Sequence, residues 1–425
     1  MAANLESVRL GAFKSYRGQE LSLGPMTLLV GRNGSGKSNA LDALSLLALL
    51  AEERDVNDLE RGDFEVAGLR GGVSGAAPFG KTPIEVGCSV RLEDGSLAEL
   101  DVTIDIEGRP EILSETLKLT TKAAVRVLIQ SGRQHSASGI SDAKVYSAGQ
   151  PKTYHLLSSR LAVVQAVGKV PGDSAARRLV VETCEQVLGV LRGVFVLDPV
   201  PSGMRQYARV GSPPDRAGAN LSAVVYALRK NKRAWTRLTE LVQALVETHI
   251  EEITFVEAKL PGDRLMDVMV ALRERVGRQH FTTDARVMSD GTLRYLSIVA
   301  SLLHLRASGS FGTTLVVEEI ENGLFPSQAR RVLDLLREEA SEQSVRLLAT
   351  THSPALLDAL HPADHASVIL CDRQPDGLSR LQRLTDHPRY VEIAGAGAVG
   401  RAITRGELER EPAPRARSVA ELFGT

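Results

Sequence analysis

The residues with the clearest chemistry stand in a glycine-rich stretch, GRNGSGKS at 31–38. It matches the pattern G-x-x-x-x-G-K-[ST] in full, and it lies between an apolar run at 27–30 and a helical pattern of leucines. Glycines let backbone N–H groups point at phosphate oxygens, while Lys37 reaches the β- and γ-phosphates and Ser38 offers its hydroxyl to Mg²⁺. The stretch therefore predicts a site for ATP and Mg²⁺. Its expected binding residues are Gly31, Arg32, Asn33, Gly34, Ser35, Gly36, Lys37, Ser38 and Asn39.

Two carboxylates follow a second apolar run, TTLVV at 313–317. This is the pattern of a buried parallel strand that delivers acidic side chains to its carboxyl end, where α/β sheets bind their ligands. We expect Glu318 to hold the metal, directly or through water, and Glu319 to polarise the attacking water as a general base. A surface acidic turn is the alternative, but it does not fit so apolar a strand.

Two shorter motifs flank this strand. Ser289-Asp290-Gly291-Thr292 begins a helix with an apolar face, so Ser289 or Asp290 caps it and Gly291 allows a close approach. His352 follows an apolar strand at 345–349, where it can reach the γ-phosphate or the attacking water. The alternative for His352 is an ordinary hydrogen-bonded polar residue, but its Thr-Thr-His-Ser-Pro context favours function.

The densest basic cluster surrounds Trp235, which would stack on an exposed base if the cluster binds nucleic acid. The alternative is a solvated helix face and a turn between two helices, which the acidic residues further along favour. The residues expected to contact nucleic acid are Arg229, Lys230, Lys232 and Arg233.

The remaining pattern is that of an α/β protein. We expect strands at 5–11 and 21–23, hairpins at 84–91 with 97–106, at 253–259 with 265–273 and at 371–376 with 381–384, and helices at 117–129, 175–191 and 221–245. The segment 51–80 reads as a loop. Phe13 or Tyr16 could lie against an adenine ring, although core packing is the simpler expectation. No heptad repeat persists, which excludes a long coiled coil.

Composition describes an ordinary globular chain of 425 residues, 43% hydrophobic and 24% charged, which predicts two or three units. A net charge of −1 gives no global attraction to nucleic acid. Three scattered cysteines fit a reducing cytoplasm and argue against a zinc site. No apolar stretch reaches the roughly 18 residues of a membrane span. We therefore expect a complete cytoplasmic protein without membrane contact.

Together, the phosphate loop, the SDGT helix start, VVEEIENGLFP and TTHSP resemble, in this order, the ATP-binding-cassette ATPases of the RecF, SMC and OLD type. Within that group the chain is most similar to stand-alone ATPases of bacterial anti-phage defence and toxin–antitoxin-like gene pairs. The resemblance implies a split α/β head without a long coiled coil. It comprises an N-lobe at 1–112 with Walker A, an inserted helical and hairpin segment at 113–279, a C-lobe at 280–404 and a disordered tail at 405–425.

The resemblance also implies roles. Lys37, Glu319 and His352 would be catalytic, with Glu318 and Glu319 as the Walker B pair and His352 as the switch histidine. Residues 289–292 would form the signature that contacts ATP on a second protomer, and 321–325 would cross the dimer interface. Glu318 replaces the usual Asp, no Gln between 39 and 129 can serve the Q-loop, and Phe325 stands where an Asp is common.

The implied function is a slow ATPase switch that forms a homodimer or a higher homo-oligomer and controls a separate effector protein. Two alternatives remain open at this point. One is a RecF-like DNA-binding ATPase of DNA repair, and the other is a non-catalytic scaffold that ATP holds together. After the histidine only about seventy residues remain, too few for the nuclease that OLD proteins carry.

Overall fold

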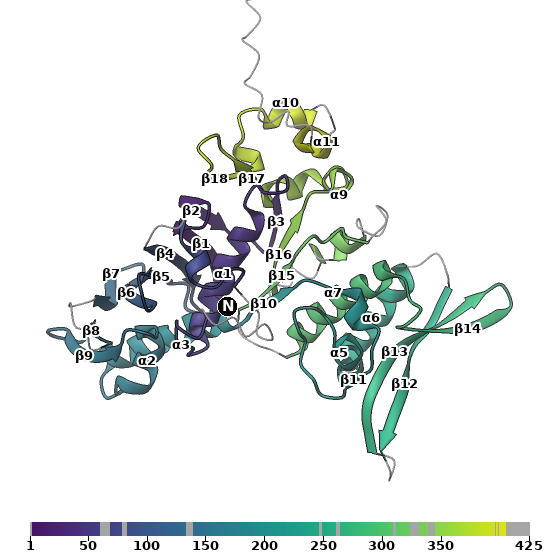
Figure 1. The fold of residues 1–425 in the computed structure, drawn as a ribbon, viewed down its shortest axis with the longest axis horizontal. Helices are drawn as coiled ribbons and strands as arrows, with labels where there is room; N and C mark the ends of the chain where they lie inside the picture. Colours follow the sequence, from purple (N-terminus) through teal and green to yellow (C-terminus); the bar gives the residue numbers. More distant parts are fainter. Residues whose placement is uncertain are drawn as a thin grey trace, which may run out of the picture.

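The computed structural model has the expected mixed α/β fold (Figure 1). Four expectations lie wholly or partly outside the residues it describes: the loop at 51–80, the interface segment 321–325 with Phe325, the hairpin turn at 261–263 and the tail at 405–425. The described residues are 2–59, 69–78, 83–132, 139–245, 249–260, 264–308, 312–323, 331–335, 337–338, 345–395, 397 and 399–404.

A six-stranded sheet occupies the centre of the molecule (Figure 1). Five of its strands are parallel and the last, β18, is antiparallel, so the carboxyl ends of the five parallel strands meet at one edge. In spatial order the strands are β10 (Val194–Leu197), β15 (Thr313–Val317), β16 (Val345–Thr351), β3 (Met26–Val30), β17 (Val368–Arg373) and β18 (Ser379–Arg383).

An antiparallel sheet of eight strands forms the lobe beside it. In spatial order these are β2 (Tyr16–Ser22), β1 (Asn4–Phe13), β4 (Ile84–Arg91), β5 (Leu97–Asp105), β6 (Glu111–Thr120), β7 (Val125–Gly132), β8 (Ile140–Val145) and β9 (Lys152–Leu157).

The helix expected at 117–129 is wrong, because this segment forms the end of β6, a turn and most of β7. Leu117 and Leu119 are buried while Lys118 between them is only half-buried, which is the two-residue period of a strand. Pairing with β5 fixes this alternation. The boundary expected between residues 112 and 113 consequently falls inside β6.

Two hydrophobic cores lie on opposite faces of the central sheet. Leu29 of β3 belongs to the core shared with the antiparallel sheet, α1 (Lys37–Ala51) and α3 (Ala175–Arg192). Its neighbours Leu28 and Val30 belong to the other core, which is covered by α5 (Leu221–Leu228), α7 (Asp290–Ala307) and α9 (Pro354–Asp358). Successive side chains of a strand point to opposite faces, so β3 contributes to both cores and its end is held rigidly.

A second lobe combines helices with a small sheet (Figure 1). Its elements are α5 (Leu221–Leu228), α6 (Lys232–Leu245), α7 (Asp290–Ala307), β11 (Ala208–Arg209), β12 (His249–Leu260), β13 (Arg264–Val276) and β14 (Gln279–Asp284). The other elements are η1 (Ser74–Ala76), α2 (Ala162–Lys169), α4 (Pro201–Met204), α9 (Pro354–Asp358), η3 (Pro362–Ser367), η4 (Leu384–Asp386), α10 (Tyr390–Gly395) and α11 (Val399–Thr404).

The helices of the described segments are short. The longest, α3 and α7, have 18 residues each, so this part of the chain contains no long coiled coil. Among the same helices, none is both long and apolar enough to cross a membrane. The hairpins expected around residues 84–106, 253–273 and 371–384 are confirmed as β4 with β5, β12 with β13, and β17 with β18.

A buried carboxylate gives the antiparallel lobe a pH-dependent stability. Glu115 of β6 is 1% exposed and accepts hydrogen bonds from the backbone N–H groups of Ala162 and Val163 at the start of α2. Burial raises the pKa of Glu115 from 4.5 to about 7, against the opposing effect of these two donors. The folded protein thus holds this proton more tightly than the unfolded chain does, and the stability it contributes is lost as the pH rises from 4.5 through about 7.

We therefore expect Glu115→Gln to remove a pH dependence of the order of 3 kcal/mol between pH 4.5 and pH 8. Urea unfolding at both pH values measures it. The amide oxygen of Gln still accepts one hydrogen bond at α2, so the variant should fold. An unchanged difference in the free energy of unfolding between the two pH values would assign the effect to another group.

Candidate nucleotide site

The phosphate loop leaves the buried strand β3 and enters α1 at Lys37. Gly36, just before α1, has a backbone φ of 117°, which residues with a side chain rarely adopt. A Cβ on Gly36 would lie 2.3 Å from Ser379 Oγ, and one on Gly31 would lie 2.2 Å from the Cys371 carbonyl oxygen. Strands β17 and β18 thus lie directly behind the loop, and only glycine fits at both positions.

Polar side chains from distant parts of the chain hold this loop from behind. Tyr16 Oη donates a hydrogen bond to the Gly36 carbonyl (3.0 Å) and lies 3.1 Å from Cys371 Sγ. Ser379 Oγ donates to the Ser35 carbonyl at 2.5 Å. Tyr16 and Phe13 are both 0% exposed, so core packing is confirmed for them and neither can stack on an adenine ring.

Lys37 lies inside the loop. Its Nζ donates hydrogen bonds to the carbonyl oxygens of Gly31 (2.6 Å) and Arg32 (3.0 Å). Burial lowers the pKa of Lys37, while the charges of nearby groups, including Glu319 and Glu321, act in the opposite direction. The ammonium group is therefore surrounded by acceptors that a phosphate can replace.

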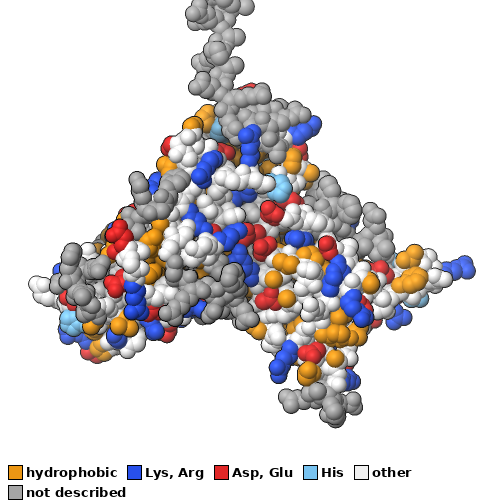
Figure 2. Space-filling view, in the orientation of Figure 1, with side chains coloured by type: hydrophobic (Ala, Val, Ile, Leu, Met, Phe, Trp, Pro, Cys, Tyr) orange, Lys and Arg blue, Asp and Glu red, His pale blue; other side chains and the backbone are white. Residues whose placement is uncertain are grey.

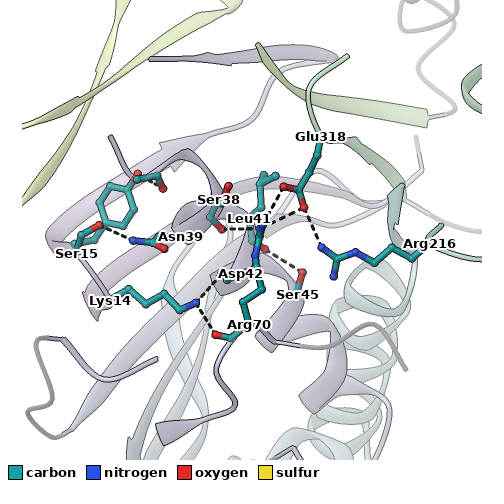
Figure 3. Close-up of polar contacts among 12 residues, drawn as sticks. Lys14, Ser15, Ser38, Asn39, Leu41, Asp42, Ser45, Arg70, Arg216 and Glu318 are labelled. Atoms are coloured by element: carbon teal, nitrogen blue, oxygen red, sulfur yellow. Dashed lines mark hydrogen bonds and ion pairs between the residues drawn. The ribbon is translucent and has the colours of Figure 1, made fainter. Parts of the chain in front are cut away.

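Glu318 lies at the carboxyl end of β15, and two arginines bind its carboxylate (Figure 3). Arg70 places Nη1 and Nη2 3.2 Å from Oε2 and Oε1, which is a bidentate contact. Arg216 adds Nη2 at 2.9 Å from Oε1. Glu318 is only 8% exposed, so the guanidinium groups supply the charge compensation that water cannot.

The same network continues to the first turns of α1 (Figure 3). Arg70 Nε contacts Asp42 Oδ1 at 3.0 Å, and Lys14 Nζ contacts Asp42 Oδ2 at 2.6 Å. Arg70 Nη2 also donates to the Ser38 carbonyl at 3.4 Å. Three cations thus share two carboxylates beside the phosphate loop. The network itself therefore carries one more positive charge than negative charge, and Figure 2 shows charged side chains gathered at the centre of this face.

The oxygen donors at this point fit Mg²⁺. Ser38, partly exposed, and Glu318 provide a hydroxyl and a carboxylate. Mg²⁺ is usually held by one or two protein oxygens together with water and substrate phosphates. Accordingly, a cluster of three or more His, Cys, Asp or Glu residues is neither needed nor found among the described residues.

Glu319 follows with a strained backbone. Its φ is +46°, which is uncommon for a residue with a side chain and costs about 1–3 kcal/mol. Its N–H donates to Thr350 Oγ1 at 2.9 Å, and its exposed carboxylate accepts a hydrogen bond from the Asn322 amide. The turn thereby separates two adjacent carboxylates, because Glu318 points to the arginines while Glu319 stays open to solvent.

His352 follows the neighbouring strand, β16, and is fixed by an acidic residue. Its backbone N–H donates to Glu321 Oε1 at 2.8 Å, and its Nδ1 lies 3.1 Å from the same oxygen. The other oxygen, Glu321 Oε2, and Ser35 Oγ of the phosphate loop are buried without a hydrogen-bond partner in the described part of the chain. Both atoms can take part in hydrogen bonds with a ligand at this edge of the sheet.

The expected helix at the SDGT motif is confirmed as α7. Ser289 Oγ caps it by accepting a hydrogen bond from the Thr292 N–H at 3.1 Å. Arg205 Nη2 contacts Asp290 Oδ1 at 2.5 Å. A Cβ on Gly323, at the end of the acidic turn, would lie 3.5 Å from Gly291 N, so this turn packs against the start of α7.

The basic cluster lies away from this edge, on α5 and α6. Arg229 stacks over the rings of Tyr226 and Phe255, 5.1 and 5.6 Å from their centroids. Trp235 is half-buried and stacks on Phe255 at 6.3 Å, which argues against its stacking on a base. The exposed side chains of Lys232 and Arg233 line a cavity of about 1030 Å³, together with Arg237, Glu240, Arg306 and Glu338.

Sequence reasoning missed the contacts that Arg70, Arg216 and Tyr16 make across the fold, although it placed Tyr16 in the core or against an adenine ring. Arg70, Arg216 and Tyr16 are each separated from their partners by at least twenty residues, and none belongs to a recognisable motif. The one available signal for Arg70 was an isolated arginine in an otherwise small and apolar stretch, GLRGGVSGAAPFG.

The parallel sheet, the glycine loop and the acidic strand end together define a P-loop α/β protein. The family described as "AAA domain, putative AbiEii toxin, Type IV TA system" matches residues 26–129 and 204–358, more than half of the chain. The chain therefore belongs to this family. The matched residues contain the phosphate loop, the start of α7 and the carboxyl ends of β15 and β16.

Curated relatives match over a shorter region. The "DNA replication and repair protein RecF" of Synechococcus sp. (strain JA-2-3B'a(2-13)) is 46% identical over 57 residues, 13% of this chain. This match spans 15% of that protein's length. The expected likeness to RecF is thus confirmed for one short region.

Two solved structures have similar folds. An SMC head bound to the C-terminal winged-helix domain of ScpA is 14% identical, with a TM-score of 0.48, covering 89% of this chain and 97% of that one. A second structure, described as "Structure of the recombination mediator protein RecF-ATPrS in RecFOR pathway", is 13% identical, with a TM-score of 0.39, covering 89% of this chain and 98% of that one. At these scores the two similarities add nothing to the argument about function.

Proposed function

We propose that this protein is an ATP-binding and ATP-hydrolysing switch that dimerises on ATP and controls a separate effector protein in bacterial anti-phage defence. The supporting observation is the convergence of three neighbouring strand ends. The strands β3, β16 and β15 are parallel neighbours in the sheet. Lys37 follows β3, His352 follows β16 and Glu319 follows β15, so all three lie at the same edge. Brought together in this way, they provide the parts that phosphoryl transfer to water requires.

Each residue then has a distinct task. Lys37 places a charge on the β- and γ-phosphates, Glu319 accepts a proton from the attacking water, and His352, held by Glu321, hydrogen-bonds to the γ-phosphate. Ser38 and Glu318 would hold Mg²⁺, which when bound offsets the charge of the phosphates. A Glu at position 318 supports the metal less rigidly than the shorter Asp, so we expect slow turnover.

Dimerisation would complete the site. Ser289 and Asp290 at the start of α7 are exposed, where a second protomer can present its nucleotide to them. The family description names a toxin of a type IV toxin–antitoxin system, which supports a role in a two-component bacterial device with a separate effector. We place the protein in the cytoplasm because its three cysteines are free, as they are in a reducing compartment.

A RecF-like DNA-binding ATPase is the second candidate. The 57-residue match to RecF and the basic cavity at Lys232 and Arg233 favour it. In that case duplex DNA should stimulate phosphate release, and the logarithm of the affinity should fall steeply with the logarithm of salt concentration. A lack of stimulation, with binding insensitive to salt, would count against this candidate.

The first test measures assembly and turnover together. We expect mass photometry to show dimers with ATP and Mg²⁺ and monomers with ADP or without nucleotide, and we expect phosphate release through many turnovers. A dimer without turnover would favour the alternative of a non-catalytic scaffold. A monomer in all three conditions would overturn the proposed switch. Protein isolated from its native host with ATP and Mg²⁺ should bring down an effector protein, whereas nucleic acid alone would favour DNA repair.

A further inference from the structure

The carboxylate proposed to hold the metal is already engaged in this structure. Arg70 and Arg216 make three contacts of 2.9–3.2 Å with Glu318, which is 8% exposed. These three contacts occupy most of the positions at which the carboxylate can accept, and the two guanidinium charges oppose a cation there. Direct binding of Mg²⁺ to Glu318 would therefore displace at least one of them.

The two arginines reach Glu318 from different parts of the fold (Figure 3). Arg70 is also bound to Asp42 of α1, so it is anchored on the side of the phosphate loop. Arg216 lies in the connection at 213–220, which leads into α5 of the second lobe. Glu318 consequently joins the two lobes through charges rather than through an apolar contact.

The connection that carries Arg216 also packs against the helix of the SDGT motif. Gly218 has a φ of +70°, and a Cβ there would lie 2.7 Å from Ser297 Oγ of α7. Asp215 organises this connection by accepting hydrogen bonds from Ala219 N (3.0 Å) and Asn220 N (2.9 Å). Movement of Arg216 would therefore shift the connection that packs against α7, the helix that begins with the SDGT motif.

We propose that Arg70 and Arg216 form a cationic clamp on Glu318 that opens when Mg²⁺ and ATP bind, and that the release of Arg216 transmits nucleotide occupancy to the 213–220 connection and α7. This rests on the proposed function and deepens it, because it names the residues that connect the nucleotide to the second lobe. No glutamine between residues 39 and 129 is available for that connection. The phosphates of the bound nucleotide supply the anion that the arginines lose.

The coupling is tested by hydrogen–deuterium exchange on the full chain, with the non-hydrolysable analogue AMP-PNP in either EDTA or Mg²⁺. Since Asp215 protects the Ala219 and Asn220 amides, we expect Mg²⁺ to increase exchange across 213–220 in the wild type. Arg216→Ala should show this increased exchange already in EDTA. Arg209→Ala, an exposed arginine of β11, is the matched control and should behave as the wild type.

The competition between the metal and the two arginines for Glu318 gives a second readout. Mn²⁺ is used in place of Mg²⁺, and electron paramagnetic resonance measures its binding in the presence of saturating AMP-PNP. Loss of an arginine frees the carboxylate, so Arg216→Ala should bind Mn²⁺ roughly 5- to 100-fold more tightly than the wild type. Arg70 contacts the same carboxylate from the side of the phosphate loop. Arg70→Ala should therefore also tighten the binding of Mn²⁺. It serves as the second variant if Arg216→Ala does not fold.

The failures are distinguishable by measuring fluorescent ATP binding first. If the wild type binds no nucleotide, the proposed function fails and the clamp fails with it. If nucleotide binds but Mg²⁺ leaves exchange at 213–220 unchanged, or if both arginine variants bind Mn²⁺ no more tightly than the wild type, the clamp is overturned and the ATPase proposal stands.

Discussion

Glu319→Gln is expected to reduce multiple-turnover phosphate release by at least about 100-fold, the effect of removing a general base. Gln has the size of Glu and can still accept the hydrogen bond from the Asn322 amide, so the left-handed turn should persist. It cannot accept a proton from the attacking water. ATP binding should remain close to that of the wild type, because Lys37, Ser38 and the loop amides are untouched.

The same variant should accumulate as an ATP-bound dimer, since hydrolysis is the step that opens it. Mass photometry after ATP addition measures the dimer, and a coupled phosphate assay measures turnover. Glu182→Gln, an exposed glutamate of α3, is the matched control and should keep wild-type rates. Normal turnover in Glu319→Gln would remove Glu319 from the role of base and leave Glu321 or His352 to be tested next.

Local patterns were sufficient for the elements that carry the motifs. The phosphate loop, the start of α7 and the acidic end of β15 each combine a consecutive motif with a clear apolar period, and the structure places all three as expected. The capping of α7 by Ser289 follows from the residue type alone. These features depend on neighbours within a few residues, which is why sequence could reveal them.

The failures came where pairing with distant strands decides the outcome. Leu117, Ala124 and Leu128 are spaced by seven and four residues, as on one face of a helix, but β5 on one side and β8 on the other draw the segment into a sheet. Asn220 stands at the N-cap of α5, a position that its residue type favours, but its side chain makes no capping bond and instead joins Asp215 and Pro213. Tertiary contacts override the local preference in the first case, and a competing local contact does so in the second.

The sequence also contains no indication that arginines from distant segments compensate the charge of Glu318. Neither the GLRGGVSG stretch nor the proline-rich segment before α5 suggests that an arginine from each meets at Glu318. Such a pairing arises only once β15 has delivered the carboxylate to the sheet edge. The sequence therefore predicts the residues that follow strands, while the structure adds the cations that hold them.

Lys37→Ala is expected to weaken ATP binding by at least about 100-fold, because in the proposed site the lysine would make charge-assisted contacts worth roughly 1.5–3 kcal/mol each with two phosphates. The ammonium now donates to the Gly31 and Arg32 carbonyls, both within 3.0 Å, so it is already inside the loop and needs only to exchange acceptors. Burial lowers the pKa of Lys37, and phosphate charge would act in the opposite direction, which makes the charged amine more stable in the complex than in the free loop.

Fluorescent ATP binding measures this loss, with Lys122→Ala, an exposed lysine between β6 and β7, as the matched control. Thermal unfolding should be checked in parallel, because Lys37→Ala leaves two loop carbonyls without their donor. The loop itself should persist in the variant, since Tyr16 and Ser379 hold the Gly36 and Ser35 carbonyls from behind. Retained binding in a folded Lys37→Ala protein would place the nucleotide at another site, and with it the roles of Glu318, Glu319 and His352 at this edge would fall.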